Sequence, residues 1–365
     1  MISVRQAPAS ITWKMKGRVN MRSTRQIITM VLLCAAVVSS RSAGAQFLVN
    51  GAGATFPTPL YTRWFNTYAR IDPSVRFNYQ SVGSGAGIAQ IISRQVDFGA
   101  SDAPMNDKQL AEAPGKILHF PTVLGADVIT YNLPRLTEPL RFTGPVVADI
   151  FLGKITKWND QAIAELNPNA KLPDIPIVVC HRSDGSGTTF VFTDYLSKIS
   201  PEWASKVGKG TSVSWPVGFG GNGNQGVTEL VKQTSGAIGY VELAYAVENH
   251  LPASRLKNHD GNWVEANTKT VTSAAASAAA SMPSDFRVSI TDAPGADSYP
   301  ISSFTYLLIY EQQKDGAKGK ALVAFIEWML HDGQNFTIPL SYAPLPGSVI
   351  AVEEKQLKMI KLAPQ

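Results

Sequence analysis

Two glycine-flanked runs of small and hydroxyl-bearing residues could bind an anion. The first is GAGATF at 51–56, and the second is RSDGSGTT at 182–189. Each run is joined to an apolar pattern with helical spacing, so each would lie at the start of a helix. Helix starts present unpaired backbone N–H groups and the positive end of the helix dipole. We therefore expect a small anion to be the ligand of this chain.

The second run combines a cation with several donors. Arg182 follows an apolar strand and offers a fork of N–H donors to an oxyanion. Asp184 could hold that guanidinium in place and reduce its free charge. Ser186 and Thr188 supply hydroxyls, and Gly187 permits close approach of the backbone. The same residues also fit an Asp-Gly turn in which Ser186 caps a helix, and spacing alone does not separate the two interpretations.

Further candidates lie in the first 60 residues after position 45. The backbone N–H groups of Thr55 and Phe56 could reach an anion, and Ser84 lies in a GSG run before another helical pattern. Asp102 ends a predicted strand, where its charge would repel an anion. A carboxylate can only accept hydrogen bonds, so it would favour an anion that still carries a proton. A turn or capping role for Asp102 is the alternative.

The motifs of several enzyme classes are incomplete. The GxG of the first run lacks the third glycine of a dinucleotide-binding loop. Neither Ser84 nor Ser186 has the GxSxG context of a hydrolase nucleophile, and no GK[ST] ends a phosphate loop. The five histidines show no metal-ligand spacing. We therefore expect no catalytic residue, cofactor or metal.

The charge of the chain argues against nucleic acid as a partner. Formal net charge is +5, but residues 1–45 hold seven of the 33 basic residues and none of the 28 acidic ones. The rest of the chain is nearly neutral, with no basic stripe. Its length allows two domains.

The basic first segment resembles a secretory signal peptide over residues 1–45. Arginines precede the apolar run 27–38, and AGA at 43–45 forms a cleavage site. Residues 1–20 are either an overextended start, with Met21 the natural one, or an unusual n-region. Leu33 before Cys34 disfavours a lipid anchor. Cys180 then remains alone after cleavage and fits a buried strand position.

Short strands alternate with helical patterns, which predicts an α/β fold. The run 120–131 lacks helical period and is expected to cross between domains as a strand. Other strands are expected over 75–79, 96–100, 175–180 and 304–310, and helices over 57–70, after 83–87, from 187 to 199 and over 321–329. The glycine- and asparagine-rich run 217–226 is expected to be a loop, and the small-residue run 271–280 a surface helix or linker.

Taken in order, the motifs resemble the periplasmic phosphate-binding proteins of ABC-type phosphate importers, the PstS family. The resemblance runs from about Val49 through most of the body, fades over 255–297 and weakens near the C-terminus. One departure is Cys180-His181 before the arginine motif, where basic or apolar residues are common. The motifs that carry the resemblance are GAGATFPTPLY, VDFGASDAPM, FPTV, FLGKITKWND, RSDGSGTTFVFTDYL, GAIGYVELAYA and YPIS.

The resemblance implies a two-lobed periplasmic-binding-protein fold of type II, with mixed sheets, helices on both faces and two hinge crossings. Residues 46–125 and 300–365 would form lobe I, and 126–299 lobe II. The family is not enzymatic. Its members bind inorganic phosphate with high affinity in the interlobe cleft, in the periplasm, and deliver it to an ABC permease complex in the inner membrane. A monomer with a cleaved signal peptide is expected.

The resemblance also implies a ligand set, in which Asp102 distinguishes protonated phosphate from sulfate and Asp184 orients the arginine. The residues matched as phosphate ligands are Thr55, Phe56, Ser84, Asp102, Arg182, Ser186, Gly187 and Thr188.

Three other interpretations stay open. The same fold could bind sulfate, molybdate or a phosphonate, although Asp102 disfavours the first two. A secreted phosphatase would need a metal or an activated nucleophile, and the sequence suggests neither. A surface adhesin or sensor could use the same scaffold without transport.

Overall fold

The computed structural model describes residues 46–133, 136, 138–278 and 282–363, and Gln46–Gln365 forms one compact unit. The predicted signal peptide lies outside the described residues. Within the described ranges, the longest apolar helices fall short of what a membrane span requires.

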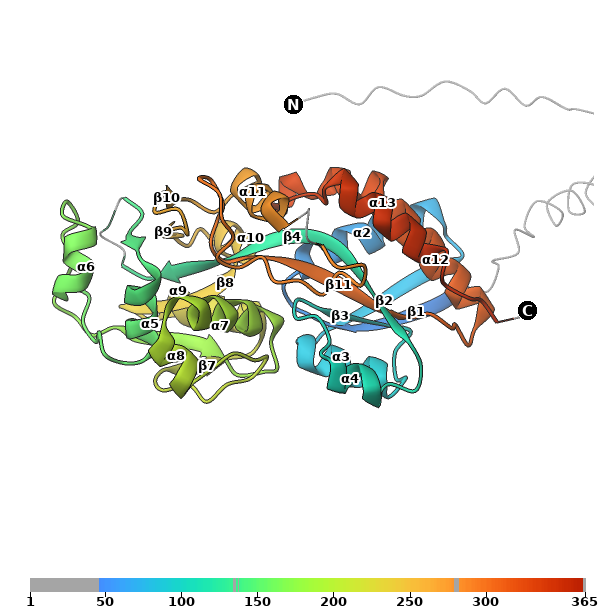
Figure 1. The fold of residues 1–365 in the computed structure, drawn as a ribbon, viewed down its shortest axis with the longest axis horizontal. Helices are drawn as coiled ribbons and strands as arrows, with labels where there is room; N and C mark the ends of the chain where they lie inside the picture. Colours follow the sequence, from blue (N-terminus) through green and yellow to red (C-terminus); the bar gives the residue numbers. More distant parts are fainter. Residues whose placement is uncertain (1–45, 134–135, 137, 279–281, 364–365) are drawn as a thin grey trace, which may run out of the picture. The chain divides into compact units, whose positions relative to one another are not determined.

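An eight-stranded mixed sheet forms the centre of this unit, and a three-stranded sheet in the order β10-β9-β5 accompanies it (Figure 1). The strand order of the large sheet is β2-β1-β3-β11-β4-β8-β6-β7. The strands are β1 (Phe47–Gly53), β2 (Val75–Ser81), β3 (Phe98–Ser101), β4 (Ile117–Tyr131), β5 (Arg141–Phe142), β6 (Val178–Arg182), β7 (Phe219–Gly221), β8 (Ala237–Glu242), β9 (Arg255–Lys257), β10 (Trp263–Val264) and β11 (Ser302–Tyr310).

Helices alternate with most of these strands and cover both faces of the sheet. In Figure 1, α3 and α4 lie on one side of β1, β3 and β11, and α12 and α13 lie on the other. The helices are α2 (Thr58–Ile71), α3 (Ser84–Ile92), α4 (Asp107–Glu112), α5 (Gly144–Phe151), α6 (Gln161–Leu166), α7 (Gly187–Ile199), α8 (Pro201–Lys206), α9 (Gly223–Gln233), α10 (Leu243–Glu248), α11 (Thr268–Ala278), α12 (Gly316–Leu330) and α13 (Gly347–Leu357), with short 3₁₀ turns at Asp332–Phe336 and Ile338–Leu340.

Strand β4 joins the two parts of the large sheet. All 15 of its residues are buried, which explains why the sequence shows neither helical period nor alternation there. From Ile117 to Ala126 the strand pairs with β11, and from Asp127 to Tyr131 it pairs with β8. The strand therefore changes partners between Ala126 and Asp127, next to the predicted lobe boundary at residue 125.

Aromatic side chains fill the core between α2, α12 and the first strands. Phe65 of α2 stacks on Phe77 of β2, with ring centroids 5.1 Å apart, and Phe325 of α12 lies 4.5 Å from Phe77. In α2, Leu60, Trp64 and Tyr68 share one buried face at helical spacing, so the amphipathic pattern of the sequence selects the face that packs on the sheet.

Most of the predicted elements are confirmed, with boundaries that shift by a few residues. One prediction needs correction. The run 217–226, expected to be a loop, contains strand β7 and the first residues of α9. The run 271–280 was expected to be a surface helix or linker, and its residues 271–278 belong to α11, which buries Val271, Ala274 and Ala275 and exposes Thr272 and Ala276, as a surface helix does. Residues 279–280 lie outside the described residues. Cys180 is buried in β6, as predicted.

Helix α3 packs so closely on the sheet that only glycine fits at position 87. A Cβ there would lie 2.5 Å from the Cα of Gly53 and 2.7 Å from the carbonyl oxygen of Ala52, both backbone atoms. We expect Gly87→Ala to lower the free energy of unfolding by about 1–3 kcal/mol, because overpacking outweighs the gain in helix propensity. Urea unfolding measures the change.

Gly347→Ala is the matched control, because a Cβ at that position of α13 meets nothing within 4 Å. We expect this variant to unfold like the wild type. Equal free energies of unfolding for Gly87→Ala and Gly347→Ala would contradict the conclusion that close backbone packing requires glycine at position 87.

Candidate functional site

The predicted binding residues follow the carboxyl ends of parallel strands. Strand β1 pairs in parallel with β2 and β3, and strand β6 pairs in parallel with β8 and β7. The chain leaves β1 towards Thr55, β3 towards Asp102 and β6 at Arg182. In open α/β sheets such strand ends form the ligand crevice. The two parts of the sheet thus contribute loops and helix starts to one place.

Arg182 and Asp184 form a bidentate ion pair at these strand ends. The Arg182 Nε donates to Asp184 Oδ1 at 2.7 Å, and Nη2 donates to Oδ2 at 2.5 Å. The two side chains are only 1% and 12% exposed. The backbone N–H of Gly223 also donates to Asp184 Oδ1, at 3.0 Å. Burial acts to raise the pKa of Asp184, but the hydrogen bonds and charge of Arg182 lower it overall, so the pair is ionised and nearly neutral as a unit.

The start of α7 carries the next group of predicted residues. Ser186 is the N-cap, and its Oγ accepts from the backbone N–H of Thr189 at 3.0 Å. The structure therefore confirms the helix-capping interpretation of Ser186, which leaves its hydroxyl hydrogen for another acceptor. Thr188 is buried, and its Oγ1 accepts from Arg182 Nη1 at 3.2 Å.

Asp102 is a buried carboxyl group with one oxygen satisfied. Its Oδ1 accepts from the hydroxyl of Thr305 at 2.8 Å, and its backbone N–H donates to Ser84 Oγ at 3.2 Å. Among the described residues, Asp102 Oδ2 has no hydrogen-bond partner. This oxygen faces the first residue of α7, since a Cβ on Gly187 would lie 2.4 Å from it and 2.4 Å from Ser84 Oγ.

Burial raises the pKa of Asp102 to about 7, against smaller lowering effects from Thr305, Arg182 and Ser84. A buried carboxyl oxygen without a donor is costly when it is ionised. The site therefore contains an acceptor that is stabilised by any partner able to bring a proton to Oδ2.

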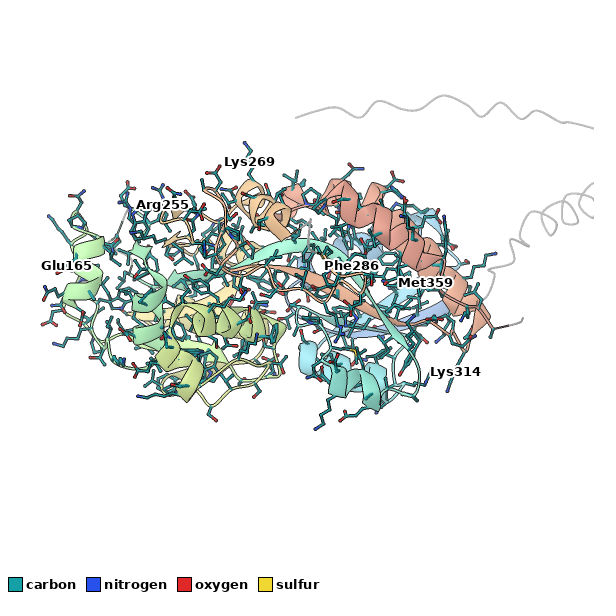
Figure 2. All side chains as sticks on the ribbon, in the orientation of Figure 1. Glu165, Arg255, Lys269, Phe286, Lys314 and Met359 are labelled. Carbon is teal, nitrogen blue, oxygen red and sulfur yellow. The ribbon has the colours of Figure 1, made fainter. Side chains whose placement is uncertain are left out.

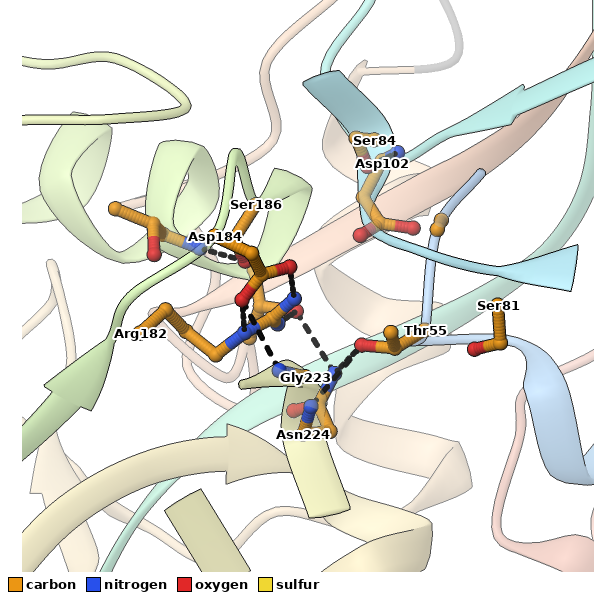
Figure 3. A network of polar contacts seen from close by, with 12 residues as sticks. Thr55, Ser81, Ser84, Asp102, Arg182, Asp184, Ser186, Gly223 and Asn224 are labelled. Carbon is orange, nitrogen blue, oxygen red and sulfur yellow. Dashed lines mark hydrogen bonds and ion pairs between the residues drawn. The ribbon is translucent and has the colours of Figure 1, made fainter. Parts of the chain in front are cut away.

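Thr55 and Phe56 lie in the turn before α2. The Thr55 hydroxyl contacts Asn224, whose backbone N–H and side-chain Nδ2 donate to Oγ1 at 3.1 and 2.9 Å. The Phe56 side chain is buried, and its carbonyl accepts from the hydroxyl of Tyr342 at 2.7 Å. Figure 3 shows Thr55, Asn224 and Arg182 within one polar network, with Ser84 and Asp102 beside it.

Several residues of this network were not predicted from the sequence. Asn224 and Gly223 belong to the run interpreted as a loop, although its GGNGNQG pattern before an apolar helical period could have indicated a further helix start. Thr305 lies within a predicted strand, and nothing in the sequence marks its contact with Asp102.

Two more buried acids lie near the site, and neither pairs with a cation among the residues that the structure describes. Asp127 and Glu242 are register partners on β4 and β8, and both are fully buried. Burial, together with the charges of Asp102 and Glu242, raises the pKa of Asp127 well above its usual range. Burial also raises the pKa of Glu242 well above its usual range. Both Asp127 oxygens lack partners in the described part of the chain, whereas Glu242 Oε2 accepts from Ala244 N–H at 2.7 Å. Both raised pKa values therefore favour the neutral form of these two acids in the interior next to the site.

His181 and Cys180 precede Arg182 in the chain and pack into the protein interior. His181 stacks on Trp215, with ring centroids 4.7 Å apart. Burial raises the pKa of the Cys180 thiol to about 11, which makes it a poor nucleophile. Over the ranges that the structure describes, no three His, Cys, Asp or Glu side chains are grouped to hold a metal. Figure 2 shows the charged side chains Glu165, Arg255, Lys269 and Lys314 at the periphery of the ribbon.

Comparison with known proteins identifies the family. A family profile described as a PBP superfamily domain matches residues 38–332. The phosphate-binding protein PstS of Xylella fastidiosa is 47% identical over 304 residues, which cover 83% of this chain and 82% of that protein. The chain belongs to the PstS family. PstS of Pasteurella multocida is 44% identical over 311 residues, which cover 85% of this chain and 90% of that protein.

A solved structure supports the fold class. The phosphate-binding protein from Stenotrophomonas maltophilia superposes with a TM-score of 0.65 at 19% identity, covering 85% of this chain and 93% of that one. At this identity the likeness shows the fold alone. The predicted α/β fold of the periplasmic-binding-protein class is confirmed.

The raised pKa of Asp102 makes the stability of the ligand-free protein depend on pH. Between about pH 4 and pH 7 the folded state holds a proton that the unfolded state releases, so stability falls as pH rises through this window. The loss is up to about 4 kcal/mol, at about 1.4 kcal/mol for each pKa unit. We expect Asp102→Asn to remove this decline, so that the variant gains stability over the wild type at pH 8 and not at pH 4.

Urea unfolding of phosphate-free protein at both pH values measures the effect. The matched control is Asp297→Asn, at an exposed position. This variant should show the same pH dependence of stability as the wild type. A stability difference between Asp102→Asn and the wild type that is equal at pH 4 and pH 8 would contradict the assignment.

Proposed function

We propose that this protein binds inorganic phosphate between its two lobes and serves as the substrate-binding component of an ABC-type phosphate importer. The observation that carries the proposal is the buried acceptor Asp102 Oδ2, which has no hydrogen-bond partner in the part of the chain that the structure describes and which faces the start of α7 beside Ser84. Its relatives in Xylella fastidiosa and Pasteurella multocida are phosphate-binding proteins rather than enzymes, which supports a non-enzymatic role.

The proposed ligand set gathers around the ion pair of Arg182 and Asp184. Backbone N–H groups and hydroxyls at three helix starts would satisfy the phosphate oxygens, because a buried polyanion is costly unless its oxygens are paired. The residues proposed to bind phosphate are Thr55, Phe56, Ser84, Asp102, Arg182, Ser186, Gly187 and Thr188, with Asp184 orienting the arginine.

Asp102 would supply selectivity. Phosphate retains at least one proton near neutral pH and can donate it to Asp102 Oδ2, whereas sulfate is fully ionised and cannot. An ionised Asp102 facing sulfate would leave a buried, unsatisfied contact between like charges, which costs a few kcal/mol. Phosphate is therefore preferred over sulfate, and most strongly above the pKa of Asp102.

Transport requires that the site open and close. The proposed lobes, 46–125 with 300–365 and 126–299, would move about the segment where β4 changes partners between Ala126 and Asp127. We propose that a monomer acts in the periplasm after removal of residues 1–45, and that its closed form docks on the permease complex of the inner membrane.

Titration calorimetry with phosphate, arsenate and sulfate tests the ligand. We expect the wild type to bind phosphate at least about 100-fold more tightly than sulfate at pH 8, from the cost of one unsatisfied charged contact. Asp102→Asn should reduce this ratio about tenfold or more, because an amide can donate to sulfate.

The control for calorimetry is Asp97→Asn, which removes a carboxylate that pairs with Lys318 away from the site. This variant should keep the wild-type ratio. An unchanged phosphate-to-sulfate ratio in Asp102→Asn would exclude the selectivity role, and absence of phosphate binding by the wild type would exclude the proposed function.

X-ray scattering tests the hinge. Because donors come from both proposed lobes, phosphate should stabilise the closed form and reduce the radius of gyration, whereas sulfate at the same concentration should not. Identical scattering curves with and without phosphate would count against closure.

A further inference from the structure

Asn224 occupies a central place that the proposed ligand set does not use. It is the second residue of α9 and is fully buried. Its side-chain Nδ2 donates to the hydroxyl of Thr55, which follows β1 (Figure 3), and to the hydroxyl of Thr188 in α7. In the proposed division it would therefore join a hydroxyl of lobe I to a hydroxyl of lobe II.

The orientation of the Asn224 amide follows from a backbone group. The N–H of Glu242 donates to Asn224 Oδ1 at 2.9 Å. A backbone N–H can only donate, so the amide oxygen must lie on that side and the NH₂ group must face the two threonines. The side chain is thus fixed as a donor towards both hydroxyls.

The two hydroxyls have their lone pairs occupied. Thr55 Oγ1 accepts from the backbone N–H and the Nδ2 of Asn224, at 3.1 and 2.9 Å. Thr188 Oγ1 accepts from Arg182 Nη1 at 3.2 Å and from Asn224 Nδ2 at 3.0 Å. A hydroxyl has two acceptor positions and one hydrogen. Each threonine is therefore left with its hydrogen to donate, and the described residues include no acceptor for either hydrogen.

We infer that Asn224 is a positioning residue that turns the hydroxyls of Thr55 and Thr188 into obligate donors for the bound anion. The inference rests on the proposed phosphate site, and it adds what fixes these two hydroxyls as hydrogen-bond donors. Without the amide, each hydroxyl could rotate and present a lone pair to a ligand oxygen. Because one amide serves both hydroxyls, the full donor set forms only when the turn before α2 contacts the start of α9.

Asn224→Ala combined with a double-mutant cycle tests this role. We expect Asn224→Ala to weaken phosphate binding about tenfold in calorimetry, the size of one charge-assisted hydrogen bond. In a background with Thr55→Val and Thr188→Val the same change should cost less than about twofold, because the hydroxyls through which it acts are gone.

Asn224→Asp provides a second test that keeps the acceptor for Glu242 N–H. Its carboxylate would draw both hydroxyl hydrogens away from the anion, so we expect a larger loss of affinity than for Asn224→Ala. Relative to the wild type, this loss should shrink as pH falls from 8 to 5, because a protonated carboxyl can donate again. A purely structural role of Asn224 predicts a smaller loss of affinity for Asn224→Asp than for Asn224→Ala, because aspartate matches the shape of asparagine more closely than alanine does.

The matched control is Thr228→Val, which removes the hydrogen bond from the Thr228 hydroxyl to the Asn224 carbonyl without touching the amide. It should bind phosphate like the wild type. An equal cost of Asn224→Ala in both backgrounds, or no cost in either, would overturn this inference while leaving the proposed function intact. Failure of the wild type to bind phosphate would overturn both.

Discussion

The bidentate pairing of Arg182 with Asp184 is the constraint on which the candidate site depends. A lone guanidinium in this buried position would be costly and would attract any anion. Asp184 removes most of that charge through two short hydrogen bonds. A bound anion would then meet mainly neutral donors, namely backbone N–H groups and hydroxyls, beside the partly neutralised guanidinium of Arg182. Neutral donors select by geometry and protonation rather than by charge alone, which gives the buried acceptor Asp102 Oδ2, beside Ser84 and Gly187, its importance.

The path of strand β4 explains how distant residues reach that pair. Its first ten residues pair with β11 and its last five with β8, so one continuous strand belongs to both parts of the sheet. On each side, parallel strands end in turns that begin helices. The carboxyl ends therefore face a common space, and the donors of α7 and α9 meet Thr55 and Asp102 there. The fully buried acids Asp127 and Glu242 lie at this junction, where burial raises the pKa of both carboxyl groups.

The local features of the site could be predicted from the sequence because they are encoded in short runs. The turn residues around Arg182, the cap at Ser186 and the GSG run before α3 each depend on a few neighbouring residues. The long-range partners could not be predicted in this way. Thr305 lies 203 positions from Asp102, and Asn224 lies 169 positions from Thr55. The run around Asn224 was also misinterpreted, because its glycines and asparagines indicate a loop by composition although tertiary pairing makes part of it a strand.

The position of β11 in the sheet also affects how the sheet forms during folding. Strand β3 ends at Ser101, yet its neighbour on one side, β11, begins only at Ser302. About two hundred residues of chain therefore separate that edge from the strand that covers it. Contacts of such sequence separation form slowly, and an uncovered edge is open to pairing with other chains. The N-terminal strands therefore complete their side of the sheet only when Ser302–Tyr310 pairs with β3.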